Sequence, residues 1–259
     1  MTEPVLKDVL SCLQFSRQNV DIQAILPDRS NIFIDVKRCR ATDLQQLEWL
    51  AASVEHEQDA CPKTLVFATS INTVSDIYEW LMYRLRQKAY TNESVDTTTH
   101  LVSMFHAHIS PCLQEYIMTE FRKPDSVVRV VVATIAFGMG VQIADVRRVV
   151  HWGKVSSLMA FWQQIGRCGR DGLPAHAIWY ATSATGQDSK IFGAIKAGEQ
   201  CQRHTLLAGF VIDKTTEQQL CCLQTSREQA VSCTLSCECC TCVLCTCCSV
   251  CKQNCPCSR

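Results

Sequence analysis

Short apolar runs alternate along the chain with longer amphipathic stretches. Residues 64–70 (TLVFATS) have the pattern of a buried strand, and apolar side chains follow at helical spacing over 71–85. A second strand is expected at 101–105, before a helix that Ser110 caps and Pro111 begins. The pattern of a strand followed by a helix therefore repeats.

The stretch 127–134 (VVRVVVAT) is β-branched and nearly continuous in apolar character, which is typical of a strand covered on both faces of a parallel sheet. The runs 146–151 and 177–181 continue the alternation, with a helix between them that begins near residue 156 or 157. The pattern predicts an α/β fold with a doubly wound parallel sheet. We expect ligands at the carboxyl ends of its strands.

Composition limits the possible classes of protein. The 259 residues are 47% hydrophobic, enough for one α/β domain and an appendage, and 25 Lys and Arg balance 25 Asp and Glu. Total charge therefore gives no sign of nucleic acid, and any such contact must come from local geometry. No run of 18 apolar residues and no signal peptide is present, so we expect an intracellular chain without a membrane partner.

Two arginines lie three residues apart on a glycine-rich turn. Residues 163–172 read QQIGRCGRDG and place Arg167 and Arg170 where side chains can reach across a cleft. A guanidinium suits phosphate because it donates two hydrogen bonds and keeps its charge, so one arginine could act as a finger on a γ-phosphate. The alternative is a solvated basic loop or a nonspecific RNA contact. The segment 133–147 (ATIAFGMGVQIADVR), at the end of a predicted central strand, favours the first interpretation.

These two segments resemble motifs V and VI of RecQ-family helicases of superfamily 2, in which they read ATxAFGMG and QExGRxGRDG. The resemblance extends to TLVFATS as motif IV, to Phe105-His106-Ala107 where the family commonly has Tyr-His-Ala, and to residues 28–31 (DRSN), similar to an Arg-Pro-Asn that opens the second RecA-like domain. It covers residues from about 27 to 210. It implies a helicase C-terminal RecA-like domain at 27–185, after a remnant of the first RecA-like domain and a linker at 1–26.

The resemblance also implies the residues of the nucleotide site. Those that match the family's ATP contacts are Gln163, Arg167, Arg170, Gly140 and Gln142, with Arg170 as the arginine finger and the first three as the catalytic set. Gln142 replaces the usual Asn or Asp, and Gln164 replaces the usual Glu of motif VI. Both changes keep a hydrogen-bonding group, so nucleotide affinity could be reduced while the fold is kept.

A second set is implied for nucleic acid. Its members follow the strands of motifs IV and V, and they are Thr69, Ser70, Thr134, Phe137 and Gly138. A helix cap at residues 69–70 and plain turn glycines at 138 and 140 are the alternative interpretations.

The chain contains no G-x-x-x-x-G-K-[ST] and no Asp-Glu-x-His, so it has no phosphate cradle and no carboxylate pair for Mg²⁺. In the family these belong to the first RecA-like domain, and residues 1–14 resemble the helix that follows motif III. We therefore expect a truncated gene product that is inactive alone. ATP and Mg²⁺ would bind only with an ATP-bearing first RecA-like domain, supplied in cis or in trans.

Most of the 19 cysteines lie after residue 200. Residues 199–210 resemble the start of the RecQ zinc-binding region, which implies a helical region at 186–225 and a Zn²⁺ site. Its candidate ligands are Cys201, Cys221, Cys222 and Cys233, although the fourth ligand is unassigned and buried free thiols are the alternative. Residues 226–259 form a Cys-rich, low-complexity tail that resembles metallothionein in composition, and a frameshifted or misassembled end fits equally well.

The leading hypothesis from these patterns is part of a 3′–5′ DNA helicase of RecQ type, acting in DNA repair and recombination at single strands and duplex junctions. Nuclear localisation follows from the resemblance alone. Two alternatives remain open: a non-catalytic nucleic-acid-binding or regulatory module, and a truncated gene product with a metal-binding tail.

Overall fold

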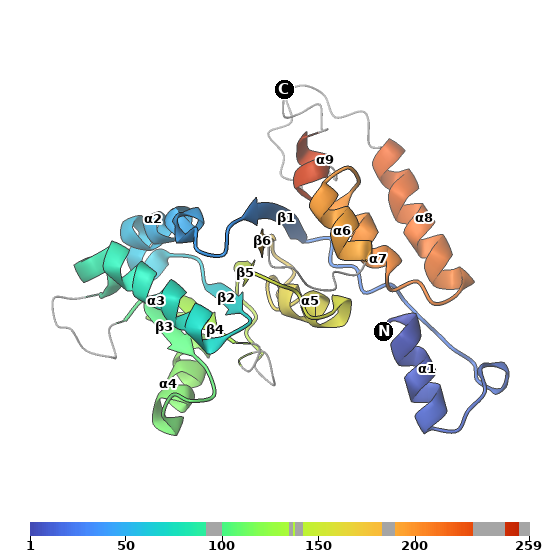
Figure 1. The fold of residues 1–259 in the computed structure, drawn as a ribbon, viewed down its shortest axis with the longest axis horizontal. Helices are drawn as coiled ribbons and strands as arrows, with labels where there is room; N and C mark the ends of the chain where they lie inside the picture. Colours follow the sequence, from blue (N-terminus) through green and yellow to red (C-terminus); the bar gives the residue numbers. More distant parts are fainter. Residues whose placement is uncertain (92–99, 135–136, 138–141, 183–189, 230–246, 254–259) are drawn as a thin grey trace. The chain divides into compact units, whose positions relative to one another are not determined.

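The computed structural model describes residues 1–91, 100–134, 137, 142–182, 190–229 and 247–253 (Figure 1). The chain divides into two compact units. The unit that we call the sheet unit comprises Asp35–Ser156 and Phe161–Gly186. The other, which we call the terminal unit, comprises Met1–Ile34, Ser157–Ala160 and Gln187–Arg259. Each unit is described by itself.

A six-stranded sheet has the order β1-β6-β5-β2-β4-β3. The strands are β1 (Ile32–Cys39), β2 (Thr64–Ala68), β3 (Val102–Phe105), β4 (Val130–Ala133), β5 (Arg148–Trp152) and β6 (Ala175–Thr182). Each neighbouring pair from β6 to β3 is parallel. The predicted α/β fold with a parallel sheet is confirmed, and the VVRVVVAT stretch supplies a strand paired on both sides.

Helices connect these strands and extend beyond them. The α-helices are α1 (Glu3–Cys12), α2 (Glu48–Glu57), α3 (Ile71–Leu85), α4 (Pro111–Arg122), α5 (Leu158–Ile165), α6 (Lys190–Ala197), α7 (Gln202–Ala208), α8 (Lys214–Gln229) and α9 (Ser249–Gln253). Short 3₁₀ helices lie at Arg17–Asn19, Leu44–Leu47, Gln58–Ala60 and Arg86–Ala89. Within the described residues, none of these helices combines the length and the apolar character that a membrane span requires.

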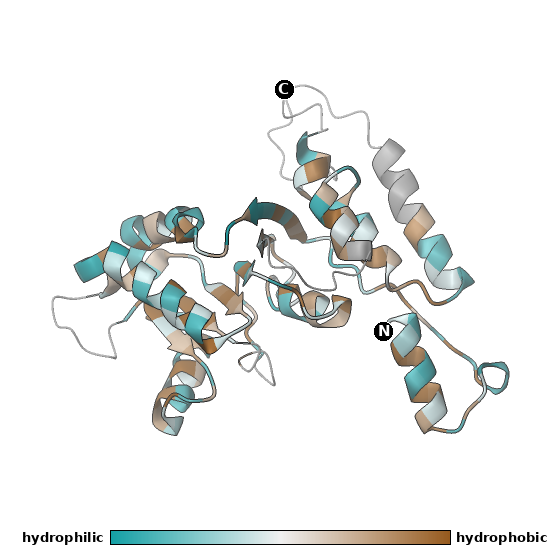
Figure 2. Cartoon of the chain, viewed as in Figure 1, coloured by the Kyte–Doolittle hydropathy of each residue, from teal (hydrophilic) through white to brown (hydrophobic). Residues whose placement is uncertain are grey.

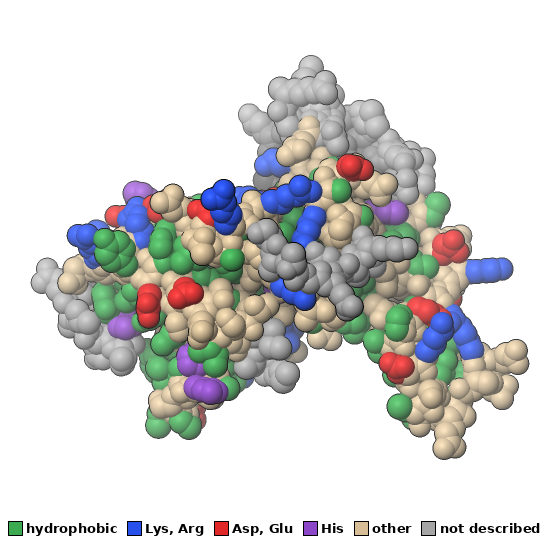
Figure 3. Space-filling view, viewed as in Figure 1, with side chains coloured by type: hydrophobic (Ala, Val, Ile, Leu, Met, Phe, Trp, Pro, Cys, Tyr) green, Lys and Arg blue, Asp and Glu red, His purple; other side chains and the backbone are tan. Residues whose placement is uncertain are grey.

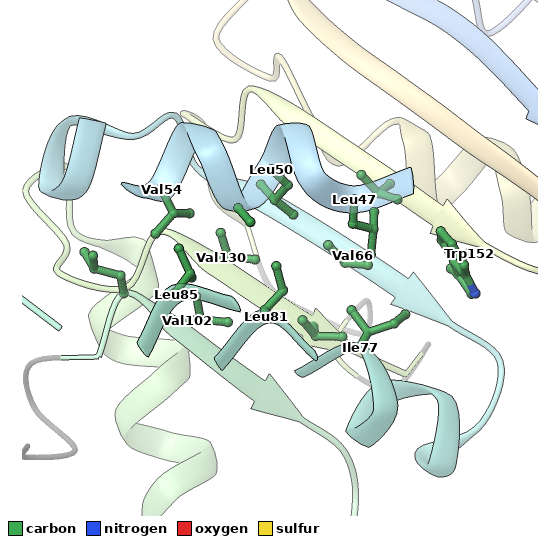
Figure 4. Close-up of a cluster of buried hydrophobic side chains, with 14 of the residues drawn as sticks. Leu47, Leu50, Val54, Val66, Ile77, Leu81, Leu85, Val102, Val130 and Trp152 are labelled. Carbon is green, nitrogen blue, oxygen red and sulfur yellow. The ribbon is translucent and has the colours of Figure 1, made fainter. Parts of the chain in front are cut away.

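The sheet unit buries apolar side chains on one sheet face beneath α2 and α3 (Figure 4). Side chains alternate between the two faces along a strand, so Val66 and Val130 lie on the face that meets these helices. From α3, Ile77, Leu81 and Leu85 complete the cluster. Hydrophilic and hydrophobic residues accordingly alternate along α3 (Figure 2). Each such buried side chain contributes about 1.5–3 kcal/mol of transfer free energy.

Aromatic side chains fill the opposite face of the sheet. The Phe137 ring lies edge-on to Phe105 and Phe121, with centroids 4.8 Å and 6.1 Å apart. Phe161 of α5 lies 5.5 Å from the Trp179 ring of β6. The sheet is thus covered on both faces, which explains why its central strands are apolar throughout.

One buried arginine organises the terminal unit. Arg203 of α7 is only 2% exposed, and its Nη1 donates to Asp28 Oδ1 at 2.6 Å and to the Arg29 carbonyl at 2.8 Å. Its Nη2 donates to the carbonyls of Ile32 and Cys247. A single guanidinium therefore joins the DRSN segment, α7 and the cysteine-rich end.

Candidate functional site

The turn after α5 is shaped by its glycines. A Cβ at Gly166 would lie 3.0 Å from the Trp162 carbonyl oxygen, which is tighter than most real Cβ contacts, so the neighbouring backbone would have to shift. Gly169 has φ +59°, a conformation that favours glycine, and its N–H donates to the Val146 carbonyl at 2.8 Å. The turn is therefore held against the segment that leads into β5.

An ion pair fixes the same turn from the side. The Asp171 carboxylate accepts from the Arg147 guanidinium and, at 3.1 Å, from the Leu173 N–H. The hydrogen bond from Arg147 is the main reason that the pKa of Asp171 lies below its ordinary value. Asp171 thus holds the turn in shape, a role that the linear motif does not reveal.

Arg167 and Arg170 both lie partly exposed on this turn, outside the packing of the sheet. Arg170 Nε lies 3.4 Å from the Gly166 carbonyl oxygen. Burial, and then the charge of Arg170, lowers the pKa of Arg167. The two guanidinium groups repel each other, so an anion bound between them would be stabilised by both.

The position of this turn differs from our expectation for ligands. Gly169 bonds to Val146 just before β5, and the His176 N–H at the start of β6 donates to the Arg147 carbonyl at 2.8 Å. The arginines therefore lie at the amino ends of β5 and β6, whereas we expected ligands at the carboxyl ends of strands; the place where a ligand binds stays a prediction. Crossover connections return the chain to this edge before each new strand, which explains the difference.

The two glutamines of motif VI have different environments. Gln163 is exposed, whereas Gln164 is buried and its Oε1 lies 2.7 Å from His151 Nδ1. The other ring nitrogen of His151 lies 3.1 Å from the Lys154 carbonyl oxygen. Burial lowers the pKa of His151, which favours the neutral imidazole. Gln164 therefore serves an internal contact between α5 and β5.

Three of the residues that we predicted for nucleic acid lie at the carboxyl ends of strands, on the side of the sheet opposite to the arginine turn. Thr69 and Ser70 follow β2 and are exposed, and Thr134 follows the adjacent strand β4. Ser70 Oγ accepts from the Thr73 N–H at 3.1 Å, so it caps α3 as the alternative interpretation had it.

The other predicted residues divide between core, surface and the undescribed part of the chain. The Phe137 ring is 2% exposed and belongs to the core, so it does not lie on the surface where we predicted a nucleic-acid contact. Gln142 is exposed. Gly138 and Gly140 lie outside the described residues.

Four cysteines of the terminal unit come together. The Sγ atoms of Cys201, Cys247, Cys248 and Cys251 all lie within 4.8 Å of one another, a grouping that could hold a metal ion. The Sγ atoms of Cys201 and Cys247 are 3.6 Å apart, and those of Cys201 and Cys248 are 4.0 Å apart. A hydrogen bond with Cys247 lowers the pKa of Cys201 to about 7, and contacts with Cys201 and Cys247 lower that of Cys248. The pKa values of Cys247 and Cys251 are raised, chiefly by contact with Cys201.

Of the predicted zinc ligands, only Cys201 is in this group. Cys221 is exposed on α8, the side chain of Cys222 is not described, and Cys233 lies outside the described residues. Sequence reasoning missed Cys247, Cys248 and Cys251, because their C-C-x-x-C spacing is one of several similar repeats in the tail.

Known proteins share parts of this chain. The model of the helicase conserved C-terminal domain matches residues 44–172. The mouse bifunctional 3'-5' exonuclease/ATP-dependent helicase WRN is 26% identical over 178 residues, which are 68% of this chain and 11% of that protein. The ATP-dependent DNA helicase RecQ of Haemophilus influenzae is 41% identical over 76 residues, 29% of this chain and 12% of that protein.

A solved structure shares the fold. Dbp5 of S. cerevisiae, bound to RNA and ADP BeF3, superposes with a TM-score of 0.55 at 13% identity, over 87% of this chain and 52% of that one. This chain thus contains a helicase C-terminal domain with a RecA-like fold. More particularly, its similarity to the WRN and RecQ helicases supports a C-terminal domain of the RecQ type. The matched segments span only about a tenth of the two curated relatives.

Proposed function

We propose that this chain acts as the second motor half of a RecQ-type, ATP-dependent 3′–5′ DNA helicase. In this role Arg170 is the arginine finger, and Arg167 and Gln163 contact the same nucleotide. A first RecA-like domain, in cis or in trans, supplies the phosphate cradle and Mg²⁺ that this sequence lacks.

The observation that carries the proposal is the pair of arginines on a fixed turn. The glycine geometry and the Arg147–Asp171 ion pair hold the turn, so little ordering is needed when a nucleotide arrives. The lowered pKa of Arg167 means that burial and the nearby Arg170 destabilise its charged form, and a bound phosphate would stabilise that form again. Such pre-organised cations stabilise the charge that develops during phosphoryl transfer.

The carboxyl ends of the strands, opposite to the arginine turn, offer a separate contact for nucleic acid. Thr69, Ser70 and Thr134 offer hydroxyl groups at the carboxyl ends of β2 and β4. Hydroxyls and backbone N–H groups bind phosphate oxygens without reading sequence. Nucleotide and nucleic acid would then contact opposite sides of the sheet, the first at the amino ends of β5 and β6 and the second at the carboxyl ends of β2 and β4. A shift of the sheet could then couple hydrolysis to movement along DNA.

The test is reconstitution of ATP hydrolysis. A RecQ first RecA-like domain, which carries the phosphate cradle, is fused to this chain, and DNA-stimulated ATP hydrolysis is measured. The fusion should hydrolyse ATP faster than the first domain alone, and Arg170→Ala should lower kcat by about 10³-fold. Arg122→Ala, which changes an exposed arginine on α4, is the matched control and should leave the rate within about twofold.

Two results would contradict the proposal. If the fusion gains no ATPase activity although it binds DNA, a non-catalytic nucleic-acid-binding module is the better description. If Arg170→Ala and Arg122→Ala behave alike, the arginine turn is not the finger.

We infer further that Cys201, Cys247, Cys248 and Cys251 hold one structural Zn²⁺. Tetrahedral Zn–S bonds of about 2.3 Å place neighbouring sulfurs about 3.8 Å apart, and the Sγ separations of 3.6 Å and 4.0 Å agree with this. The ion would join α7 to α9 and stabilise the terminal unit.

Metal content tests this ligand set against the one predicted from sequence. Purified protein should contain one zinc per chain, Cys251→Ser should lose most of it, and Cys221→Ser should keep it. Loss of zinc in Cys221→Ser but not in Cys251→Ser would show that the four described cysteines are not the ligands. Several ions per chain would instead favour clusters of the metallothionein kind.

A further inference from the structure

A second surface feature of the sheet unit lies outside the arginine turn. A groove of about 690 Å³ opens at the carboxyl ends of β2, β5 and β6, and one face of α3 forms its wall. Thr73, Asp76, Trp80 and Tyr83 line it from α3. Their spacing of three or four residues places them in one row along the helix.

The charge of this groove is unusual for a nucleic-acid surface. Asp76 and Glu79 are both exposed and line it, against a single lysine, Lys154, from the segment after β5. Acidic side chains lie over α3 beside hydrophobic ones (Figure 3). Thr69, one of the residues proposed above for nucleic acid, also lines this groove. Binding to a phosphodiester backbone depends on Lys and Arg, so the α3 wall, with two carboxylates against one lysine, disfavours nucleic acid along that wall.

Aromatic rings lie next to these carboxylates. Trp80 is partly exposed and follows Asp76 by four residues, so both can contact the same cation. Tyr83 is 75% exposed, and Arg86 of this chain already lies 5.9 Å above its ring. Guanidinium groups favour such stacking, and carboxylates complete their hydrogen bonding.

The floor of the groove holds an unused donor. Trp152 is 1% exposed, and its Nε1 has no hydrogen-bond partner among the described residues. Its ring lies at the edge of the aliphatic cluster, with the nitrogen turned away from that cluster (Figure 4). A buried N–H without an acceptor is unfavourable, so an occupant that brings a carbonyl oxygen would be favoured.

We propose that this groove binds an arginine-bearing segment of a partner protein. The guanidinium stacks on Trp80 and pairs with Asp76 and Glu79, and a small movement of the groove floor lets a main-chain carbonyl of the segment accept from Trp152. A peptide satisfies the carboxylates, the ring and the indole N–H together. A nucleic-acid strand satisfies the ring and the lysine but leaves the carboxylates opposed to phosphate.

The experiment measures binding of a labelled peptide to the full chain. The probe is a fluorescein-labelled ten-residue peptide with three arginines among serine and glycine, and anisotropy is followed at low and physiological salt. The same peptide with glutamate in place of arginine, and a labelled oligothymidine, are the comparison ligands.

The variants measure separately the contributions of the two carboxylates, the Trp80 ring and the Trp152 N–H to binding of the peptide. Asp76→Asn with Glu79→Gln should weaken binding of the arginine peptide about tenfold or more, because two charge-assisted contacts are lost. The matched control, Glu115→Gln with Asp125→Asn, changes two exposed acids elsewhere in the sheet unit and should change affinity by less than about twofold. Trp80→Ala should weaken binding severalfold, and Trp152→Phe should do so while keeping an aromatic ring.

Three results would overturn the proposal. One is an arginine peptide that does not bind the unaltered chain below about 1 mM, which is a weak affinity for any specific site. Another is equal affinity for the charge variant and its control. The third is oligothymidine binding that rises when Asp76 and Glu79 are neutralised and falls in Trp80→Ala, which would assign the groove to nucleic acid. None of these results depends on the ATPase assay, so this proposal and the motor proposal can fail separately.

Discussion

Replacing Arg203 by methionine should destabilise the terminal unit strongly. The change removes a 2%-exposed guanidinium and leaves Asp28, whose side chain is 18% exposed, without its cation. The carbonyls of Arg29, Ile32 and Cys247 also lose their donor. Removal of one partner from a buried ion pair costs about 3–5 kcal/mol, which corresponds to a factor between about 10² and several times 10³ in a local opening equilibrium.

Hydrogen exchange followed by mass spectrometry can measure this loss. Amide protection over 28–34 and over α7 should fall by about that factor in Arg203→Met. The double variant Asp28→Asn with Arg203→Met removes the uncompensated charge and should recover part of the loss. Together with the single variant Asp28→Asn, it gives the coupling energy of the pair. Unchanged protection in the single variant, or no recovery in the double variant, would refute the claim that this ion pair holds the segment.

Two further outcomes follow from contacts in the sheet unit. Burial keeps the pKa of His151 below 6.5, so the neutral imidazole contributes stability that is present above about pH 6.5 and is lost as the pH falls through the folded-state pKa. His151→Gln should therefore reduce the fall in unfolding free energy between pH 7 and 5, measured by urea unfolding at each pH. An unchanged fall in this variant would argue against a role for His151. Ser70→Ala should cost about 1 kcal/mol because α3 loses its cap, whereas Ser70→Asn should retain most of the stability; equal midpoints of urea unfolding for the two variants would contradict a capping role.

Much of the sheet could be predicted because its signals are local. The run 64–70 gives β2, the helical spacing after it gives α3 at Ile71–Leu85, and Ser110-Pro111 begins α4 as expected. The pattern does not single out β1 or α2. β1 contains charged and half-exposed residues, and α2 has little separation of polar and apolar faces, so neither stands out from the sequence alone.

The candidate site was predictable only in its local part. The glycine turn with Arg167 and Arg170 follows from one motif of ten residues. The Arg147–Asp171 ion pair joins residues 24 apart, and the cysteine group joins Cys201 to residues 46 or more positions later. Such pairings depend on tertiary contacts, and composition or spacing within a segment does not determine them.

The Arg203 contacts have a consequence for biosynthesis. Residues 28–34 cannot make their final contacts until Arg203, 175 positions after Asp28, and then Cys247 have been synthesised. A ribosome adds about 5–20 residues per second, so this interval lasts on the order of ten seconds or longer. Residues 35–182, which contain all six strands of the sheet except the start of β1, emerge completely within that interval. Residues 28–34 are therefore exposed to chaperones and proteases during this interval, while the sheet unit has been synthesised and can fold.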